Sequence, residues 1–574
     1  MRSLKDRVKQ RLGRMSLRDK IGQMLLCGFH GTEPEGEVQT LLRDYPVGGV
    51  IYFTRNVVSP EQVERLSDGL QHTARAGGNV PLWIAIDQEG GMVARITQGV
   101  TLMPGQMATA AAGSVQDAYD AARISGMELK SMGINMNFAP VLDVNNNANN
   151  PVIGVRSFGE SPESAAEFGT AAITGFQNAG IAATAKHFPG HGDTDTDSHL
   201  DLPVIPHDRA RVNQIELVPF RAAIAAGVDA VMSAHIYFPA LETERLPVTL
   251  SHSVLTGLLR KELGYEGMIV TDCMEMKAIA NHYGTVQAAV MAVEAGADLV
   301  LISHTAQLQK EAFEALMNAV SSGRISERRI DESVKRLLMY KVKRGLMEME
   351  VESGAAEGES VSISGRFGAE GRSIDPAIPT AMNAIEPSTV LFQRNSPLHQ
   401  KTARRISEKS ITLVRDTQHM LPLKRERTLV ITVGAAVTSI ADEQLDGAAL
   451  GAALLAQGLD VVDLVVAADE VAISSARLLQ AAEAEDIKQI VIGTYNAGSP
   501  SGDPQCRLIG WLQQLGKPLA VAALRSPYDL LKLPNVQTYI AAYESRPLAM
   551  NSVAKAMMGQ ITFKGKLPVS LEVD

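Results

Sequence analysis

Short apolar runs alternate with longer segments of helical periodicity from about residue 20 to residue 340. Eight runs have the β-rich, apolar composition of buried strands: QMLLCGF from Gln23, GGVIYF from Gly48, LWIAID from Leu82, INMNFAP from Ile134, IAATAKHF from Ile181, AVMSAHI from Ala230, MIVTD from Met268 and DLVLIS from Asp298. Strands that are apolar on both faces and alternate with helices are typical of parallel sheets. The pattern therefore predicts an α/β fold with a (β/α)8 TIM barrel over residues 1–346. An open, doubly wound sheet is the alternative, because it has the same alternation.

The composition changes after Met347. Residues 347–396 are rich in Gly, Ser, Ala and Glu and hold few large apolar side chains, which predicts a linker. The alternation then resumes over residues 397–574, with the runs ITLVRD, TLVITVGA, VVDLVVA, QIVIGTY, LAVAAL and TYIAAY. These runs predict a second, smaller α/β domain built as a three-layer sandwich. Gly434 and Gly498 each follow a run, but no complete dinucleotide or P-loop fingerprint surrounds them.

The bulk composition narrows the classes of partner. A chain of 574 residues is too long for one core, and 45% hydrophobic residues with 21% charged residues is ordinary for a globular protein. The formal charge of −10 argues against nucleic acid or an anionic membrane as a partner. The three cysteines form neither a disulfide framework nor a metal motif, and the N-terminus lacks the apolar core of a signal peptide. We expect a cytoplasmic protein with no membrane contact.

The densest group of reactive side chains is the segment KHFPGHGDTDTDSH, from Lys186 to His199. It holds one lysine, three histidines and three aspartates, and it follows directly after an apolar run. So many polar groups need water, a ligand or one another, which indicates a functional loop carried by a buried strand. A solvated turn rich in Asp, Gly and Thr is the simpler alternative for the DTDTD part alone.

Polar side chains also end several of the other apolar runs. In a TIM barrel the carboxyl ends of the strands meet at one face, and function concentrates there. A strand-end aspartate such as Asp272 could equally well cap the next helix when it is considered alone. The residues at predicted strand ends are Asp87, Glu89, Arg95, Asn137, Asp143, Lys186, His187, His235 and Asp272.

Neither a metal site nor a serine nucleophile is well supported by these residues. The histidines of the KHFPGHGDTDTDSH segment could bind a metal, but the interleaved aspartates suit hydrogen-bonded His–Asp pairs equally well. Ser198 lacks the G-x-S-x-G elbow of serine hydrolases. The unit Asp197–Ser198–His199 is better interpreted as a carboxylate that sets the tautomer and basicity of an imidazole, as in a general acid/base. We expect no metal and no cofactor.

Several blocks of the sequence resemble one known family. The blocks IAIDQEGGMVAR, FAPVLDVN, VIGVRSFG, KHFPGHGDTDTDSH, VMSAHI, PVTLS and IVTDCMEM resemble glycoside hydrolase family 3, in particular its NagZ-type β-N-acetylhexosaminidases. In the second domain, SITLVRD, SPYDLLKLPNVQTYIAAYES and GKLPVSL extend the resemblance over nearly the whole chain. Family β-glucosidases share the KHF but lack the Asp-Ser-His and take a glutamate from elsewhere as the acid/base. Two positions depart from the family pattern: Met92 replaces a common arginine and Cys273 a common serine.

The resemblance implies a role for each matching residue. Asp272 corresponds to the nucleophile, His199 to the acid/base and Asp197 to its polarising partner. The residues that correspond to the family's sugar-binding positions are Asp87, Arg95, Arg156, Lys186 and His187. A retaining mechanism needs a carboxylate below the anomeric carbon and a proton donor above the leaving oxygen, and these assignments provide both.

The resemblance implies a retaining exo-β-N-acetylglucosaminidase that acts on terminal GlcNAc of peptidoglycan-derived fragments, with a small carbohydrate as its partner. A phosphorylase is one alternative, because a neutral imidazole would not repel a phosphate dianion that replaces water. A β-glucosidase-like family member and a non-catalytic sugar-binding protein are the others.

Overall fold

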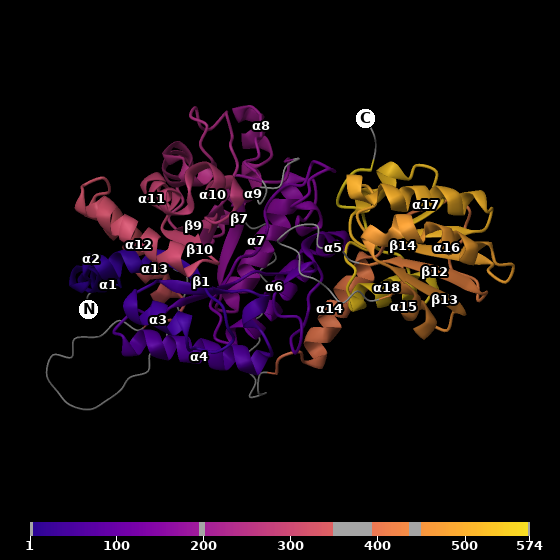
Figure 1. Cartoon of the computed structure of the whole chain (residues 1–574), viewed down its shortest axis with the longest axis horizontal. Helices are drawn as coiled ribbons and strands as arrows, with labels where there is room; N and C mark the ends of the chain where they lie inside the picture. Colours follow the sequence, from indigo (N-terminus) through magenta and orange to yellow (C-terminus); the bar gives the residue numbers. More distant parts are fainter. Residues whose placement is uncertain (1–3, 195–200, 348–392, 435–448, 572–574) are drawn as a thin grey trace, which may run out of the picture.

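The apolar runs of the first half of the chain form the eight strands of a closed barrel. The computed structural model describes residues 4–194, 201–347, 393–434 and 449–571. The parallel barrel strands are β1 (Leu25–Gly28), β2 (Gly49–Tyr52), β3 (Trp83–Ile86), β6 (Met136–Asn137), β7 (Ala182–Phe188), β8 (Ala230–Ser233), β9 (Met268–Cys273) and β10 (Leu299–Ile302). Their order around the barrel is β1-β10-β9-β8-β7-β6-β3-β2, so the predicted TIM barrel is confirmed and the open sheet is wrong. Figure 1 shows the barrel in indigo to pink, beside an orange and yellow second domain.

Helices surround the barrel and bury their apolar faces against its strands. Their starts follow local rules: Ser16 and Asp19 form a capping box at α2, and Ser59 caps α4 just ahead of Pro60. The helices are α1 (Leu4–Arg14), α2 (Leu17–Gln23), α3 (Glu37–Asp44), α4 (Pro60–Ala76), α5 (Gln106–Ala111), α6 (Val115–Lys130), α7 (Pro162–Asn178), α8 (Arg209–Gln214), α9 (Leu217–Ala225), η4 (Ser253–Glu262), α10 (Lys277–Tyr283), α11 (Thr285–Ala295), α12 (Ala306–Ser321) and α13 (Glu327–Lys343). None of the helices in the described ranges is both long enough and apolar enough to cross a membrane.

A short hairpin follows β3 that the hydrophobic pattern did not predict. Its strands are β4 (Gln88–Gly90) and β5 (Val93–Ala94), which pair antiparallel. The sequence QEGGMVA has no alternation of apolar and polar positions, so it carries no strand signal. The two turn glycines have positive φ, +96° at Gly90 and +54° at Gly91, a conformation that other residues rarely adopt.

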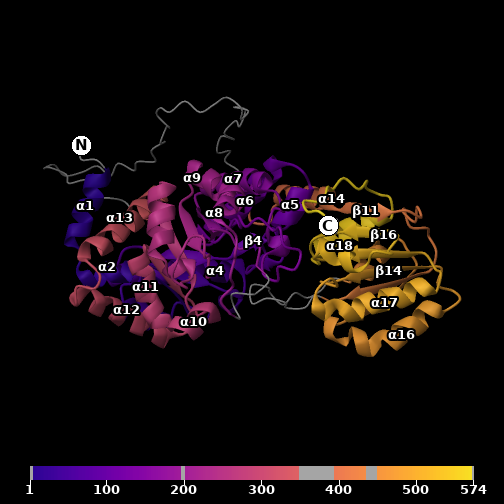
Figure 2. The same cartoon turned by 90° about the horizontal axis from the view of Figure 1, so that it is seen from above.

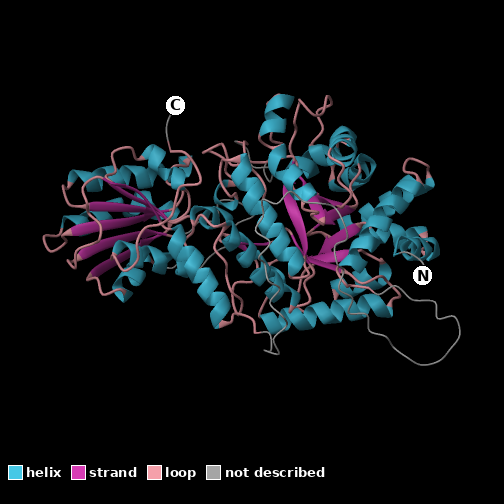
Figure 3. Cartoon of the chain, turned by 180° about the vertical axis from the view of Figure 1, so that it is seen from behind, coloured by secondary structure: helices cyan, strands magenta, loops and turns pink. Residues whose placement is uncertain are grey.

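The second domain is a six-stranded sheet between two helical layers, as predicted. The sheet order is β11-β16-β15-β14-β12-β13, and only β11 runs antiparallel to its neighbour. Helices α16 and α17 cover one face, and α15 and α18 cover the other. Figures 2 and 3 show helices on both sides of this sheet. Its strands are β11 (Thr412–Asp416), β12 (Thr428–Val433), β13 (Val461–Val466), β14 (Gln489–Thr494), β15 (Leu519–Ala523) and β16 (Thr538–Ala541), and its helices are α14 (Pro397–Ser410), α15 (Leu450–Ala456), α16 (Val471–Glu483), α17 (Asp503–Gln514) and α18 (Pro547–Met557).

The two domains share buried apolar side chains. Helix α14 lies between the domains next to α5, and its Ile406 packs in one cluster with Ile124 of α6 (Figures 1 and 2). Met92, in the hairpin turn, is 3% exposed and belongs to a cluster with residues of the second sheet. Because this contact lies between domains, Met92 has an apolar packing role. Most of the predicted 347–396 linker lies outside the described residues.

A buried lysine at the amino-terminal end of the barrel strands makes stability depend on pH. Lys341 of α13 is fully buried, and its Nζ donates to Gln23 Oε1 at 2.7 Å and to the Gly48 carbonyl at 3.0 Å. Burial lowers the pKa of Lys341 to about 7, against about 10.4 in an unfolded chain. Between these values the unfolded state binds more protons than the folded state, so stability rises with pH through this window.

We predict that Lys341→Met removes this rise. Relative to the variant, the wild type gains about 2 kcal/mol of unfolding free energy between pH 7 and pH 9. Urea unfolding at both pH values measures the gain, followed by the fluorescence of Trp83 in a Trp511→Phe background, because the chain has only these two tryptophans. If the unfolding free energies of the two proteins change with pH in parallel, Lys341 keeps its proton in the folded state.

Candidate active site

A cavity of about 500 Å³ opens at the mouth of the barrel. Residues that end or follow β2, β3, β7, β9 and β10 form its wall, so it lies at the carboxyl ends of the strands. Of the strand-end and family-matched residues that the sequence singled out, seven line this one cavity: Asp87, Glu89, Arg95, Arg156, Lys186, His187 and Asp272.

Two acidic residues after β3 organise one side of the cavity. Glu89 accepts two hydrogen bonds from the Arg156 guanidinium, from Nε at 3.0 Å and from Nη2 at 2.8 Å. The Lys186 ammonium lies 2.7 Å from Glu89 Oε1 and 2.9 Å from Asp87 Oδ1. Arg95 completes the group, with Nη2 3.6 Å from Asp87 Oδ2. Five charges from three separate segments thus form a single connected network.

The network is buried yet remains charged. The side chains of Glu89 and Lys186 are only 2% and 3% exposed. Burial alone would raise the pKa of Glu89, but the positive charges of Arg156 and Lys186 outweigh it and hold the pKa well below its usual range. At Lys186, burial works to lower the pKa, and the carboxylates of Asp87 and Glu89 raise it above its usual value. Asp87 is the most exposed member at 17%, so it is the carboxylate that a ligand can reach.

A second buried carboxylate sets the position of two histidines. Asp143 Oδ2 lies 2.7 Å from His187 Nδ1, and its Oδ1 accepts from the backbone N–H groups of His187 and His191. The Asp143 contact favours a proton on His187 Nδ1, which leaves Nε2 available as an acceptor. Burial, with the nearby His187, lowers the pKa of His191 to about 4, so His191 is neutral at pH 7. The sequence marked Asp143 as a strand-end residue but gave no sign of this pairing.

Asp272 lies on the opposite side of the mouth from Asp87. Strands β9 and β3 are four positions apart in either direction around the eight-stranded barrel. Asp272 Oδ1 accepts from the backbone N–H of Cys273 at 2.7 Å. His235, which the sequence placed among the strand-end groups, contacts the Cys273 carbonyl through Nε2 at 2.9 Å and is not part of the cavity wall. It therefore supports the end of β9.

Sequence reasoning missed a third part of the wall. Phe53, Arg55 and His304 follow β2 and β10 and line the cavity. The Arg55 guanidinium lies 4.4 Å from the Phe53 ring centroid, and its Nη1 is 3.2 Å from His304 Nδ1. The signal was available, since Phe53 ends the second apolar run and Arg55 follows two residues later, much as Asp87 ends the third.

The predicted acid/base and its partner, His199 and Asp197, lie outside the described residues. The described part of the same segment is well anchored: Asp193 Oδ2 lies 2.6 Å from His207 Nε2 and accepts from Arg211 at 3.1 Å. Within the described ranges, no three His, Cys, Asp or Glu side chains are grouped so that they could hold a metal ion.

Comparison with known proteins identifies relatives of both domains. The family model described as "Glycosyl hydrolase family 3 N terminal domain" matches residues 16–340. The solved structure of a glycoside hydrolase family 3 β-N-acetylglucosaminidase from Paenibacillus sp. str. FPU-7 is similar over 98% of this chain and 100% of its own, with 46% identity and a TM-score of 0.86.

Two curated relatives show how the similarity is distributed. Beta-hexosaminidase A of Pseudoalteromonas piscicida is 39% identical over 329 residues, so this chain spans about half of that relative, 55% of its length. A protein of Cellulomonas fimi named Beta-N-acetylglucosaminidase/beta-glucosidase is 29% identical over 98% of this chain and 95% of its own length.

The charge network predicts that removing its central carboxylate is costly. Glu89→Gln leaves the Arg156 and Lys186 charges buried with less compensation, which destabilises the barrel by about 3–5 kcal/mol. Urea unfolding followed by Trp83 fluorescence measures the loss. The matched control is Glu294→Gln, whose carboxylate pairs with Arg324 at the surface at 2.7 Å and is worth less than about 1 kcal/mol. Equal, small losses in the two variants would mean that the network contributes no more than a surface pair.

Proposed function

Since the chain belongs to glycoside hydrolase family 3, we propose that it is a retaining exo-β-N-acetylglucosaminidase that removes terminal β-linked GlcNAc through a covalent glycosyl–aspartate intermediate. The observation that carries the proposal is the placement of Asp272 across one cavity from a network of buried charges. A sugar held by that network would present its anomeric carbon to a carboxylate on the other side, as a retaining glycosidase requires.

We assign the charged network to sugar binding. Asp87 can accept hydrogen bonds from sugar hydroxyls, while Arg95 and Lys186 can donate to sugar oxygens. Because Glu89 forms ion pairs with Arg156 and Lys186, these two side chains are fixed before the sugar arrives. This lowers the entropic cost of binding. His187 adds an acceptor at Nε2.

The proposed reaction has two steps. Asp272 attacks the anomeric carbon as His199 donates a proton to the leaving oxygen, which releases the alcohol and leaves the sugar esterified to Asp272. His199 then takes a proton from water as the water oxygen attacks the same carbon. The ester bond breaks, Asp272 is restored as a carboxylate, and GlcNAc leaves with its β configuration retained. Asp197 would stabilise the protonated imidazole between the two steps.

We further propose that the natural substrates are peptidoglycan-derived fragments that end in GlcNAc. The support is the resemblance of the KHFPGHGDTDTDSH block to NagZ-type enzymes. Turnover of GlcNAc–MurNAc fragments at a higher kcat/KM than chitobiose is the expected result, and a preference for chitobiose would contradict this part of the proposal.

Product analysis tests the proposed reaction. With p-nitrophenyl β-N-acetylglucosaminide we expect free GlcNAc at a rate that added phosphate does not change, and β-GlcNAc as the first anomer in the proton NMR spectrum. Asp272→Ala should lower kcat by several orders of magnitude, because the covalent step is removed. Release of GlcNAc 1-phosphate would instead identify a phosphorylase, and near-wild-type turnover by Asp272→Ala would exclude Asp272 as the nucleophile.

The leaving group tests His199 as the acid/base. An activated aryl leaving group needs little protonation, so His199→Ala should lose far less activity in the first step on an aryl glycoside than on a natural disaccharide. Since the second step still needs a base, the glycosyl adduct should accumulate and be visible by intact-protein mass spectrometry. Asp197→Ala should show a weaker form of the same pattern. Equal losses on both substrates would assign His199 to sugar binding and would favour a carboxylic acid as the proton donor.

A further inference from the structure

The second domain reaches the sugar-binding side of the barrel at three polar contacts. The first is at the turn of the β4–β5 hairpin, where Nε of Arg546 donates to the carbonyl of Gly91. The turn is closely packed, because a Cβ at Gly91 would lie 2.5 Å from the Gly105 Cα and 3.0 Å from Glu544 Oε2. The hairpin held in this way carries Glu89 two residues earlier.

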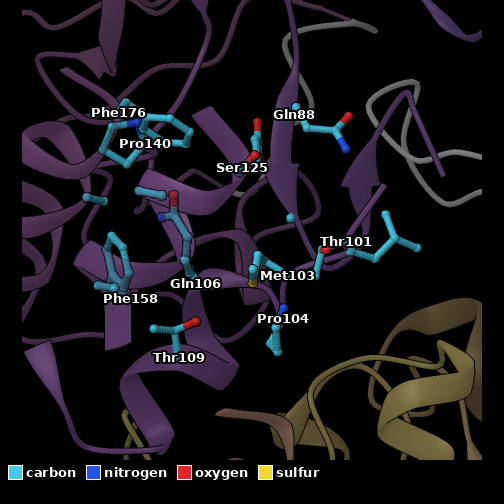
Figure 4. Close-up of a pocket in the computed structure, with 17 residues that line it drawn as sticks. Gln88, Thr101, Met103, Pro104, Gln106, Thr109, Ser125, Pro140, Phe158 and Phe176 are labelled. Carbon is cyan, nitrogen blue, oxygen red and sulfur yellow. The ribbon is translucent and has the colours of Figure 1, made fainter. Parts of the chain in front are cut away.

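The second contact is at the start of α5. Glu544 is 3% exposed, and its Oε2 accepts from the backbone N–H of Gly105 at 3.1 Å. Burial raises the pKa of Glu544 to about 6, so it is still ionised at neutral pH. Gln106, which follows Gly105 at the start of α5, donates through Nε2 to the carbonyls of Val141 at 2.7 Å and Arg156 at 2.8 Å. Figure 4 shows the Gln106 side chain extending toward Pro140, beside a small pocket of about 40 Å³.

The third contact is with the loop that leads to Arg156. The Tyr528 hydroxyl accepts from Asn145 Nδ2 at 3.1 Å and donates to the Asn145 carbonyl at 3.2 Å. Asn145 Oδ1 in turn accepts from the backbone N–H of Gly154 at 3.0 Å. Gly154 opens the short helical turn η2 (Gly154–Arg156), which ends at the arginine itself.

All three contacts therefore converge on one ion pair. The hairpin carries Glu89, α5 holds the Arg156 carbonyl, and the 145–156 loop ends at Arg156. We propose that the second domain positions the Glu89–Arg156 pair for sugar binding through Tyr528, Glu544 and Arg546. This inference rests on the proposed function, because it assigns the network to the sugar.

The physical reason is the precision that such a site needs. A displacement of about 1 Å in a binding group is enough to cost a large factor in rate. The β4–β5 hairpin pairs over only a few residues, so its own hydrogen bonds give it little rigidity. Tyr528, Glu544 and Arg546 are 7%, 3% and 6% exposed, and hydrogen bonds shielded from water fix geometry more firmly than surface contacts do.

Arg546→Met tests the proposal, because it removes the bond to Gly91 while it keeps an unbranched apolar side chain. We expect KM for p-nitrophenyl β-N-acetylglucosaminide and the Kd of free GlcNAc, measured by calorimetry, to rise together by about tenfold or more. We expect kcat to change much less, since the sugar is held alike in the ground and transition states. Arg546→Lys, which can still donate to Gly91, should recover most of the affinity. Tyr528→Phe, which removes only a hydroxyl, should give a smaller rise of the same kind.

Arg405→Met is the matched control. Arg405 also joins the domains, through Asp117 and through Asp120 at 3.3 Å on α6, but it touches neither the hairpin nor the Arg156 loop. It should lower the melting temperature without moving KM by more than about twofold.

The outcomes separate this inference from the proposed function. Equal shifts of KM in Arg546→Met and Arg405→Met, or no shift in either Arg546→Met or Tyr528→Phe, would overturn the positioning role. If the wild type releases no GlcNAc, the proposed function fails, and weaker GlcNAc binding by Arg546→Met still supports the inference.

Discussion

A carboxylate buried between two cations fixes the geometry on which the rest of this site depends. An isolated buried carboxylate is costly, so Glu89 is tolerated only because Arg156 and Lys186 meet it from two other segments. Glu89 thus links the segment of Arg156 and the segment of Lys186 to the β4–β5 hairpin. Lys186 also contacts Asp87, the most exposed acid of the network. The buried Glu89 therefore helps to align Asp87 through their shared partner Lys186. The cavity wall is therefore shaped by charge pairing that exists before any ligand binds.

The sequence predicts the architecture well because burial on both faces leaves a strong signal. All eight barrel strands and all six strands of the second sheet coincide with the predicted runs, although the edge strands β11 and β13 are only partly buried. The β4–β5 hairpin was missed because its pairing follows from turn geometry at Gly90 and Gly91, with no apolar pattern. Strand β6 has only two residues, Met136–Asn137, far fewer than the run that predicted it, because the chain leaves the sheet at the next residue.

The candidate site is predicted less completely, for a physical reason. Strand-end position located Asp87, Lys186 and Asp272, and a family resemblance added Arg156, which follows no apolar run. The position of a residue along the chain does not say which charges meet, so the pairing of Asp143 with His187 is visible only in three dimensions. His235 shows the opposite error, since it ends a strand but supports a backbone carbonyl instead of facing the cavity. The roles of Asp197 and His199 stay predictions.

The apolar contact at Met92 has a consequence for how the two halves of the chain can exist. Met92, Met107 and Val155 belong to the barrel, yet they are buried in one cluster with side chains of the second sheet. A barrel cut free near residue 347 would present these side chains to water as one patch, and such patches drive self-association. The truncated barrel would thus be prone to aggregate. The barrel therefore depends on the second domain to keep these apolar side chains covered. Genetic separation of the domains would require polar replacements on the newly exposed face.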